Sequence, residues 1–355
     1  MTNPQTETHE APEKPKAASF FSGIGGLDKG FQDAGFEISF QCEIDDFCTE
    51  ILQKHWPDVK RERNIKGLDV TTIPVSQIWL GGFPCQDVSL ARMGPRAGLK
   101  GARSGLFHDF AGLLDAGRPQ VFVLENVPGL LSSHKGRDFG TVIRTLADIG
   151  YSLGWRVLNS KNFGVPQSRS RVYIVGCYRD RRGPAEILFE PECGEGDAEQ
   201  GEPNGKAAVS PFKEILGDTV KGPVFQKIAY CLYACSARHT GTDWSRTYVT
   251  YPDGRVRRLM PRECEGVMGF PVGWTRPVAA SYTTDDPDDI DTMRYQALGN
   301  AVTPPVAKWL AGRIKRYLEM AGAENAQETK PSRPTYQATE DAAIAARPAA
   351  AAPPV

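Results

Sequence analysis

Short apolar runs alternate with amphipathic stretches over residues 17–178. The amphipathic stretches include 105–117 and 138–150, which are typical of helices packed on one side. The runs between them are short and rich in β-branched and aromatic residues, as buried strands are; they are 18–21, 38–42, 78–80, 121–124 and 172–175. This alternation predicts an α/β fold with a doubly wound, mostly parallel sheet.

The rhythm changes after residue 178. Residues 179–260 contain the turn-rich stretch GPAEILFEPECGEGDAEQGEPNGK and then short runs of mixed character. A second, smaller domain is therefore expected over 179–292, and 293–320 is expected to return to the first domain. Apolar residues every four positions predict a closing helix over 302–320; they are Val302, Val306, Leu310, Ile314 and Leu318. Pro304 and Pro305 suit its first turn, which has no backbone donor to lose.

Both ends of the chain differ from this folded part. Residues 1–16 are polar, and 321–355 are rich in Ala and Pro with few large apolar side chains, so both are expected to be disordered tails. Each tail carries a net charge of −1, which leaves +1 for the rest of a chain whose total is −1.

The composition is that of a globular protein. The chain has 355 residues, 40% hydrophobic and 24% charged, which is enough for a sizeable core. No apolar run approaches the roughly 18 residues that cross a membrane, and the N-terminus lacks a signal peptide's apolar segment, so a cytoplasmic protein is expected. Eight cysteines are scattered, with one CxxxC at 231–235 and no second pair at zinc-finger spacing. Reduced thiols are therefore expected, without a disulfide framework or a metal site.

A basic cluster lies at 86–103. Its basic residues are Arg92, Arg96, Lys100 and Arg103, against one acid, Asp87. The acidic run DDPDDID at 285–291 offsets this charge elsewhere. A local basic surface can bind phosphate even when the net charge is near zero, so the charge neither requires nor excludes a nucleic-acid partner.

A glycine-rich turn follows the first apolar run, in SFFSGIGGLDKGF at 19–31. Gly23, Gly25 and Gly26 let the backbone approach a ligand closely, at the end of a strand where doubly wound sheets bind nucleotides. Glu43 follows Gly23 by twenty residues, at the end of the next apolar run, where an acid accepts hydrogen bonds from ribose hydroxyls. The same spacing fits NAD, FAD and S-adenosylmethionine sites, and a plain glycine turn beside a surface acid stays open as well.

A cysteine stands after another apolar run, in QIWLGGFPCQDVS at 77–89. Gly81 and Gly82 end this strand, so Cys85 is expected at the same edge of the sheet as the glycine turn. Free cysteine has a pKa of about 8.5, and nearby positive groups increase the nucleophilic thiolate fraction near pH 7. Pro84 and the basic residues that follow favour an exposed, reactive thiol, while a buried structural cysteine is the alternative.

Charged residues end two further apolar runs. In VFVLENVPGLL at 121–131, Glu125 follows four apolar residues, where a buried carboxyl group needs a partner or a chemical role. In a dry site this group becomes protonated more easily and can act as a general acid. In PQSRSRVYIVG at 166–176, Arg169 and Arg171 would share one face of an extended segment and could clamp a carboxylate or phosphate. Solvated charges at the strand end are the alternative.

Taken together and in order, these segments resemble the C5-cytosine DNA methyltransferase family of bacterial and phage restriction-modification systems. The resemblance covers roughly residues 17–178 and 256–320, and six motifs carry it. They are FFSGIGG (20–26), GGFPCQ (81–86), ENVPGLL (125–131), QSRSRVYIVG (167–176), RRLMPRECEGVMGFP (257–271) and QALGNAVTPPVA (296–307). No single motif is decisive, but six in the family's order and spacing are highly specific.

The resemblance implies a covalent mechanism. Cys85 would add to C6 of a cytosine flipped out of the duplex, because the base cannot be reached inside the stack. Glu125 would hold and protonate N3, and Asn126 would help to fix the loop. C5 would then take the methyl group of S-adenosylmethionine, and loss of the C5 proton would release Cys85. Arg171 and Arg169 would hold the base, Glu125 or a nearby phosphate.

The resemblance also implies the cofactor site. The expected residues are Phe21, Ser22, Gly23, Ile24, Gly25, Gly26, Glu43, Ile44, Asn64, Ile65, Pro84, Asn300, Ala301 and Val302. Among them, Phe21 would pack beside the adenosyl group, Glu43 would bind the ribose, and Ile44 would cover the adenine. The segment 300–302 would close the pocket from the C-terminal side.

Two positions depart from the family pattern. The family's Asp-Ile pair, which accepts a hydrogen bond from the adenine amino group, corresponds to Asn64-Ile65 rather than to Asp69-Val70. An Asn carbonyl oxygen can still accept this bond. Ser19 stands where an Asp is common at the end of the first strand. Neither change touches the methyl-transfer chemistry.

The interval 179–256 matches the family least, and in this family it recognises the target sequence. The resemblance thus divides the chain into a catalytic domain (17–178), a target-recognition domain (179–292) and a returning segment (293–320). For DNA readout in the major groove the candidate stretch is CSARHTGTDWSRTYV at 235–249, with Arg238, His239 and Arg246 as base or phosphate contacts. Surface loop charges are the alternative for each of the three.

Residues 86–103 resemble the family's mobile loop, which would close over the flipped base. Gln86, Ser89 and Arg96 in it are expected to contact DNA. The expected partner is therefore double-stranded DNA, bound by a monomer that needs no metal, and a cognate restriction endonuclease would act on the same site.

Three other functions share features with this sequence. An RNA cytosine methyltransferase acting on transfer RNA shares the motifs, although the size of the 179–256 insert favours duplex DNA. A catalytically silent DNA-binding regulator is disfavoured because Cys85, Glu125 and Arg171 are all retained. A nicotinamide oxidoreductase shares the glycine turn but leaves Cys85 and the ENV segment unexplained.

Overall fold

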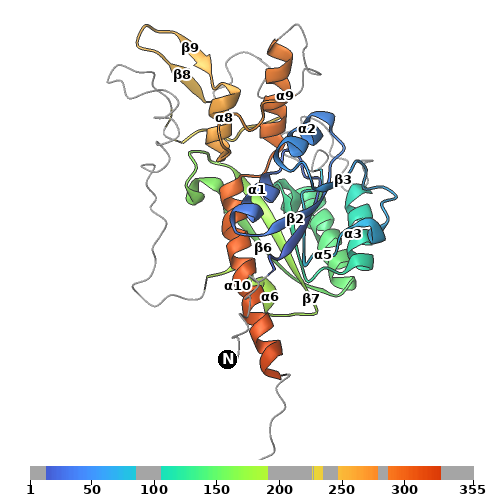
Figure 1. The fold of residues 1–355 in the computed structure, drawn as a ribbon. Coiled ribbons are helices and arrows are strands. Elements are labelled where there is room, and N and C mark those ends of the chain that lie inside the picture. Colours follow the sequence, from blue (N-terminus) through green and yellow to red (C-terminus); the bar gives the residue numbers. More distant parts are fainter. Residues whose placement is uncertain are drawn as a thin grey trace, which may run out of the picture. The chain divides into compact units, whose positions relative to one another are not determined.

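The computed structural model describes residues 13–84, 105–190, 226, 228–234, 247–278 and 287–328 (Figure 1). The chain divides into two compact units, Met1–Tyr317 and Leu318–Val355. What is described of the second unit is the last part of one helix, α10 (Pro304–Glu328). The expected border between a catalytic and a target-recognition domain falls inside the first unit and stays a prediction.

Within the described residues, seven strands form one sheet in the order β3-β2-β1-β4-β5-β7-β6. Their bounds are β1 (Lys16–Phe20), β2 (Glu37–Cys42), β3 (Lys60–Glu62), β4 (Ile78–Gly81), β5 (Val121–Asn126), β6 (Tyr151–Asn159) and β7 (Ser170–Tyr178). Neighbouring strands are parallel from β3 to β5, whereas β7 is antiparallel to both β5 and β6. The predicted α/β fold with a mostly parallel, doubly wound sheet is therefore confirmed.

The register of the central strands brings their carboxyl ends to one edge. Gly81, the last residue of β4, pairs with Phe20 at the end of β1 and with Leu124 in β5. Phe20 also pairs with the last residue of β2. Because β7 runs antiparallel, its first residues lie at that same edge, where Val172 pairs with Asn126. We call it the carboxyl edge.

Helices cover both faces of the sheet. On one face lie α3 (Gly105–Gly117) and α5 (Arg137–Asp148); on the other lie α1 (Gly26–Asp33), α6 (Gly183–Leu188) and the start of α10 (Figure 1). Two further helices, α2 (Asp46–His55) and α4 (Gly129–Ser132), follow β2 and β5. Short 3-10 turns complete this part at η1 (Val70–Thr72), η3 (Ser133–Gly136) and η4 (Ser160–Phe163).

Buried aromatic side chains join the sheet to α3. The ring of Phe20 lies 5.0 Å from that of Trp79 in β4 and 5.2 Å from that of Phe110 in α3, between centroids. Full burial of one large apolar side chain contributes about 1.5–3 kcal/mol. This packing fixes the ends of β1 and β4 relative to each other, and with them the carboxyl edge.

The remaining described elements of the first unit lie beyond the carboxyl edge (Figure 1). They are the antiparallel hairpin of β8 (Tyr248–Thr250) and β9 (Val256–Arg258), and the helices α8 (Pro261–Met268) and α9 (Pro287–Asn300). The buried carboxylate of Glu263 caps the N-terminus of α8, where it accepts a hydrogen bond from the backbone N–H of Met260 at 2.7 Å. It also forms an ion pair with Arg257 at 2.7 Å. The helix expected over 302–320 is confirmed as α10, which begins at Pro304.

The apolar runs did not reveal β3 and β6. Residues KRE make up β3, and β6 mixes buried and exposed side chains along YSLGWRVLN. These are the two outermost strands of the sheet, where fewer neighbours bury the side chains, so a continuous apolar run is not required.

Among the helices that the structure describes, none is long and apolar enough to cross a membrane.

Candidate active site

The glycine turn lies between the end of β1 and the start of α1. Its backbone takes the left-handed region at Phe21, Gly23 and Gly25, with φ of 55°, 55° and 79°. A side chain at Gly23 would meet nothing within 4 Å, so the Cα of this residue faces open space. The strained Phe21 and the open Gly23 together leave room for a ligand against the turn.

Glu43 closes this turn from β2. Its Oε2 accepts from the backbone N–H of Gly23 at 2.7 Å, and its Oε1 accepts from that of Asp45 at 2.9 Å. Burial raises the pKa of Glu43 above its usual range, and the two backbone donors oppose this shift. The carboxylate that was expected to bind a ribose therefore lies beside the open Gly23.

The exposed Ile44 follows Glu43, and 67% of its surface is accessible. An apolar side chain this exposed beside a partly buried acid is suited to cover a flat ring. Asn64 is also exposed, and its side-chain oxygen accepts from the backbone N–H of Lys66 at 3.0 Å, whereas Ile65 is buried. The backbone N–H of Glu43 donates to the carbonyl of Glu62, which brings β3 and the residues after it toward Ile44.

Two glycines of the turn serve packing. A side chain at Gly25 would meet the Trp56 ring at 2.5 Å, and one at Gly26 would meet the Val302 carbonyl oxygen at 2.2 Å. The segment 300–302 thus lies directly against the turn, as expected for a segment that closes the pocket. Within it Asn300 is exposed, while Ala301 and Val302 are buried.

Ser22 and Ile24, the other two residues of the turn, also make hydrogen bonds. The hydroxyl and backbone N–H of Ser22 point to the carbonyl of Cys42, at 3.5 and 3.2 Å. Ile24 is buried, and its carbonyl accepts from the indole N–H of Trp274 at 2.9 Å. Pro84 lies partly buried at the end of its described segment. An adenosyl group with a sulfonium tail fits this arrangement, because an acid, an open glycine and an exposed apolar side chain lie side by side at the carboxyl edge.

Glu125 lies at the end of β5 with 9% of its surface accessible. The Nε of Arg171 contacts its Oε1 at 3.0 Å. Burial raises the pKa of Glu125, and the positive charges of Arg171 and Arg169 only partly offset this effect. The carboxyl group is therefore protonated more readily than in water and is suited to act as an acid.

The residues just before Cys85 contact this strand end. The Asn126 amide donates to the carbonyl of Phe83 at 3.2 Å, and its oxygen accepts from the backbone N–H of Val127 at 2.9 Å. A side chain at Gly82 would lie 3.3 Å from Oε2 of Glu125. The segment 82–84 thus runs alongside Glu125 and Asn126.

Arg169 has partners other than those expected. Its guanidinium donates to the carbonyls of Leu232, Gly299 and Ala301 at 2.8, 2.9 and 2.8 Å, and its side chain is almost fully buried. Arg169 lies just before the first residue of β7, whereas Arg171 lies within this strand. In the structure Arg171 contacts Glu125, whereas Arg169 holds backbone segments together.

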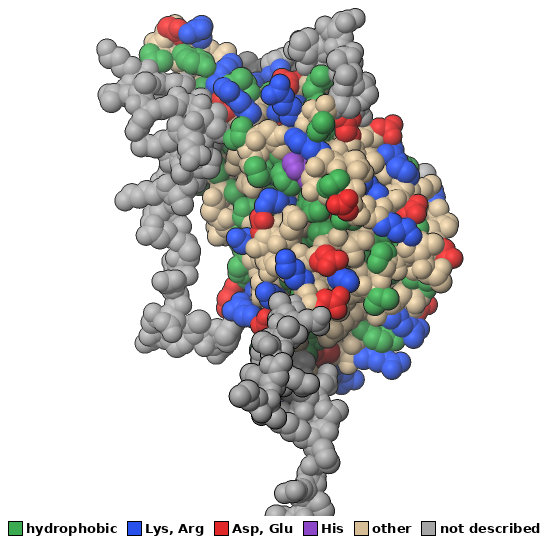
Figure 2. Space-filling model, in the orientation of Figure 1, with side chains coloured by type: hydrophobic (Ala, Val, Ile, Leu, Met, Phe, Trp, Pro, Cys, Tyr) green, Lys and Arg blue, Asp and Glu red, His purple; other side chains and the backbone are tan. Residues whose placement is uncertain are grey.

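Several expected site residues fall outside the described residues. They are Cys85, Gln86, Ser89, Arg96, Arg238, His239 and Arg246. The hairpin of β8 and β9 follows Arg238, His239 and Arg246 in the chain and is described. Its strand β9 carries Arg257 and Arg258. Figure 2 shows Lys and Arg side chains along the region of this hairpin and α8.

Two residues with a place at this edge were missed from the sequence. Trp274 binds the carbonyl of Ile24, and its ring stacks on His55 with centroids 3.5 Å apart. Gln167 is buried and binds Leu232 and Met268, at 3.2 and 3.0 Å. A tryptophan inside the turn-forming GFPVGWTRP was a signal for Trp274, while the partners of Gln167 lie too far along the chain to be foreseen.

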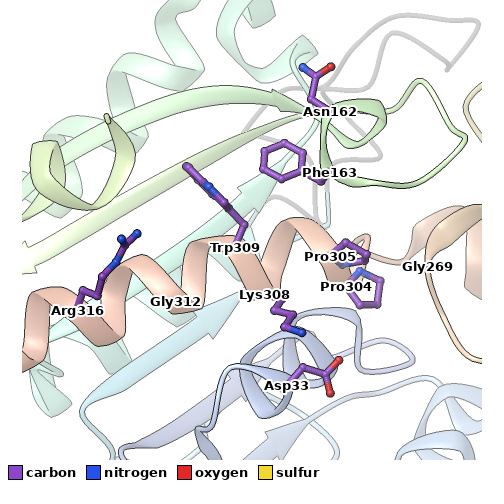
Figure 3. Close-up of a pocket in the computed structure, with 10 residues that line it drawn as sticks. All are labelled: Asp33, Asn162, Phe163, Gly269, Pro304, Pro305, Lys308, Trp309, Gly312 and Arg316. Atoms are coloured by element: carbon purple, nitrogen blue, oxygen red, sulfur yellow. The ribbon is translucent and has the colours of Figure 1, made fainter. Parts of the chain in front are cut away.

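A pocket lies elsewhere among the described residues. It measures about 710 Å³ and runs along α10, with Trp309, Phe163, Pro305 and Lys308 in its wall (Figure 3). None of the expected site residues lines it. The turn at 21–26 and the acid at 125 therefore form a site independent of this pocket.

A family model described as C-5 cytosine-specific DNA methylase matches residues 16–199 and 203–316. The chain is similar to the type II methyltransferase M.MthTI of Methanothermobacter thermautotrophicus, with 31% identity over 85% of this chain and 97% of that one. It is also similar to the type II methyltransferase M2.BsuMI of Bacillus subtilis, with 29% identity over 85% and 75%.

Solved structures share the fold. A putative DNA modification methyltransferase from an Escherichia coli prophage has a TM-score of 0.59 at 17% identity, over 86% of this chain and 100% of that one. A Spodoptera frugiperda DNMT2 mutant has a TM-score of 0.60 at 18% identity, over 85% and 100%.

Proposed function

The chain belongs to the C-5 cytosine-specific DNA methylase family and methylates C5 of cytosine in DNA, and we propose that it does so through a covalent bond between Cys85 and C6 of a flipped-out base. The observation that carries this proposal is the contact of Glu125 with Arg171 beside the segment that leads into Cys85. The buried acid and the segment that precedes Cys85 lie side by side at the carboxyl edge.

The cofactor of this proposal is S-adenosylmethionine, which supplies an electrophilic methyl group when bound. Glu43 would hold the ribose hydroxyls, because its carboxylate lies beside the open Gly23. Ile44 and Phe21 would flank the adenosyl group, and Asn64 would accept from the adenine amino group. We also assign to the proposed cofactor pocket Ser22, Ile24, Gly25, Gly26, Ile65, Pro84, Asn300, Ala301 and Val302.

Glu125 would act on the base. Burial raises the pKa of this carboxyl group, so it is protonated more readily than in water and would donate its proton to N3 of cytosine. Protonation at N3 withdraws electrons from C6, which favours addition of the Cys85 thiolate there. Arg171 would keep the carboxyl group oriented through the contact with Oε1.

We propose the following order of bond changes. The thiolate of Cys85 forms the bond to C6, and the C5=C6 electron pair becomes available at C5. After C5 is methylated, a base would remove the C5 proton, the C5=C6 double bond would return and Cys85 would leave as a thiolate, while the N3 proton would return to Glu125. Asn126 would hold Phe83, and with it the approach of residue 85, through the 3.2 Å bond.

Double-stranded DNA would lie across the carboxyl edge. Gln86, Ser89 and Arg96 would contact the flipped base and its strand, and Arg238 and Arg246 would contact bases or phosphates of the target sequence. Because the similar proteins are named type II methyltransferases, we also propose a cognate endonuclease for the same site, and a monomeric enzyme acting in the cytoplasm.

Bisulfite sequencing of DNA from cells that express the protein tests this function. Cytosines in one fixed sequence should resist conversion with the wild type and convert fully with Cys85→Ser. Transfer of labelled methyl groups to duplex DNA and to transfer RNA should label the duplex. A product in transfer RNA alone, or unprotected DNA, would overturn the proposal.

A further inference from the structure

Arg169 joins three segments that are far apart in the sequence. Its Nη1 donates to Leu232, and its Nη2 donates to both Gly299 and Ala301. The Nη1 also contacts Sγ of Cys231 at 3.6 Å, and the buried Nε has no hydrogen-bond partner among the described residues. A guanidinium group can span several acceptors at once because its donors form a rigid fork.

The neighbours of Arg169 bind the same segment. The backbone N–H of Ser168 donates to the carbonyl of Ala229 at 3.0 Å, and that of Ala229 donates to Pro166 at 2.7 Å. The Gln167 oxygen accepts from the backbone N–H of Leu232 at 3.2 Å. The stretch 166–169 therefore holds 229–232 at two points besides Arg169.

The turn 299–302 lies between this segment and the glycine turn. A side chain at Gly299 would meet the backbone of Tyr233 and Ala234 at 2.2–2.5 Å. On the other side, a side chain at Gly26 would meet the carbonyl oxygen of Val302 at 2.2 Å. At both glycines the nearest atoms are backbone atoms, which cannot move aside as a flexible side chain can. A displacement of 233–234 is therefore transmitted through 299–302 to the glycine turn.

We infer that Arg169 is a positioning residue that couples DNA recognition to cofactor binding. The inference rests on the proposed function, in which residues 235–246 contact DNA and the turn at 21–26 binds S-adenosylmethionine. The segment 228–234 leads directly into 235–246, and Arg169 ties it to the turn that closes the cofactor site. Bound DNA fixes 228–234, and through the shared guanidinium it fixes 299–302.

Coupling between two sites is reciprocal and is typically about 5- to 150-fold in affinity. S-Adenosylhomocysteine, which does not react, is the cofactor probe. Its Kd is measured by titration calorimetry with and without a duplex that carries the sequence found by bisulfite sequencing. We expect the duplex to lower this Kd at least fivefold in the wild type.

Arg169→Lys keeps the charge but replaces the fork with a single ammonium group. We expect the ratio of the two Kd values to fall to below about twofold in this variant. Arg313→Lys is the matched control, because Arg313 likewise donates to backbone carbonyls, those of Glu186, Ile187 and Phe189, away from this site. It should keep the wild-type ratio. A purely structural arginine would lower thermal stability in both variants and leave both ratios alike.

A wild-type ratio of 1, or an unchanged ratio in folded Arg169→Lys, overturns the inference. If Arg169→Lys does not fold, hydrogen exchange on the wild type decides: S-adenosylhomocysteine alone should slow exchange in 229–234, and unchanged exchange there overturns the inference. Absence of any methylated site refutes the proposed function, and the coupling falls with it. If DNA is methylated but the duplex does not change the Kd of S-adenosylhomocysteine, the proposed function stands and only the coupling role of Arg169 is refuted.

Discussion

The side-chain amide of Asn126 donates to the backbone carbonyl of Phe83 at 3.2 Å. This bond crosses from the end of β5 to the segment after β4, and Cys85 is only two residues beyond its acceptor. The end of β5, next to the acid at 125, is thus fixed to the segment before Cys85 by one buried hydrogen bond.

Loss of this bond should slow catalysis more than it weakens cofactor binding. For Asn126→Ala we expect kcat to fall about 10- to 100-fold, because small misplacements of a nucleophile are costly. The free energy of unfolding should fall by about 1 kcal/mol, the net value of one hydrogen bond. Steady-state kinetics and urea unfolding measure both. An unchanged kcat would show that the bond does not position residue 85.

The assigned nucleophile can be trapped. A duplex with 5-fluorocytosine at the target should form a covalent adduct with the wild type in the presence of S-adenosylmethionine, because fluorine at C5 blocks the proton loss that releases Cys85. The adduct is seen as a mass shift of the intact protein. An adduct that persists in Cys85→Ser would refute this assignment.

The acid role of Glu125 predicts a particular pH dependence. The pKa of this group is raised in the folded protein, and the proposed step needs its protonated form, so kcat should decline as pH rises through that raised pKa. For Glu125→Gln we expect a loss of about 10²- to 10⁴-fold in kcat, with this alkaline decline absent. The Kd of S-adenosylhomocysteine should stay within about twofold of the wild type, and wild-type turnover would exclude the acid role.

Gly26 should be intolerant of a side chain. In Gly26→Ala the new methyl group would meet the Val302 carbonyl oxygen at 2.2 Å, so we expect a loss of about 1–3 kcal/mol in unfolding free energy and weaker cofactor binding. Gly140→Ala is the control. Gly140 lies inside α5 with nothing within 4 Å of the new methyl group, so this change should stabilise the protein by about 0.5–1 kcal/mol. Thermal unfolding and calorimetry distinguish the two variants.

Asp28 gives a second pH dependence, in stability. This buried carboxyl group accepts from Ser19 at 2.9 Å and from Gln41 at 2.8 Å, and burial raises its pKa from 3.8 to about 6. Since the folded state holds the proton more tightly, the stabilisation is complete below pH 3.8 and is lost as pH rises through about 6. Its size is about 3 kcal/mol, at 1.36 kcal/mol per pKa unit.

The neutral variant Asp28→Asn tests this linkage. Its free energy of unfolding should not show the loss that the wild type shows between pH 4 and 7, so the difference between the two proteins should change by about 3 kcal/mol over this interval. Urea unfolding at a series of pH values measures it. A constant difference would mean that Asp28 titrates normally in the folded protein.

The apolar runs predicted β1, β2, β4, β5 and β7 and the mostly parallel sheet, because a strand buried on both faces must be apolar along its length. The same runs also indicated where polar residues gather. Glu43 and the segment before Cys85 each follow a strand, Glu125 lies at the end of one, and parallel strands end at one edge. The local hydrophobic pattern and the six motifs in order therefore predicted which residues of the candidate site lie at the carboxyl edge.

The antiparallel direction of β7 and the different tasks of Arg169 and Arg171 were decided by tertiary structure. The acceptors of Arg169 are 63, 130 and 132 residues away in the sequence, and no local periodicity contains them. The two arginines look equivalent in RSR, yet only Arg171 lies within the strand that pairs with β5. Sequence determined which side chains reach the edge because burial follows local pattern. Only the packed chain decided what each side chain contacts, because those partners come from distant segments.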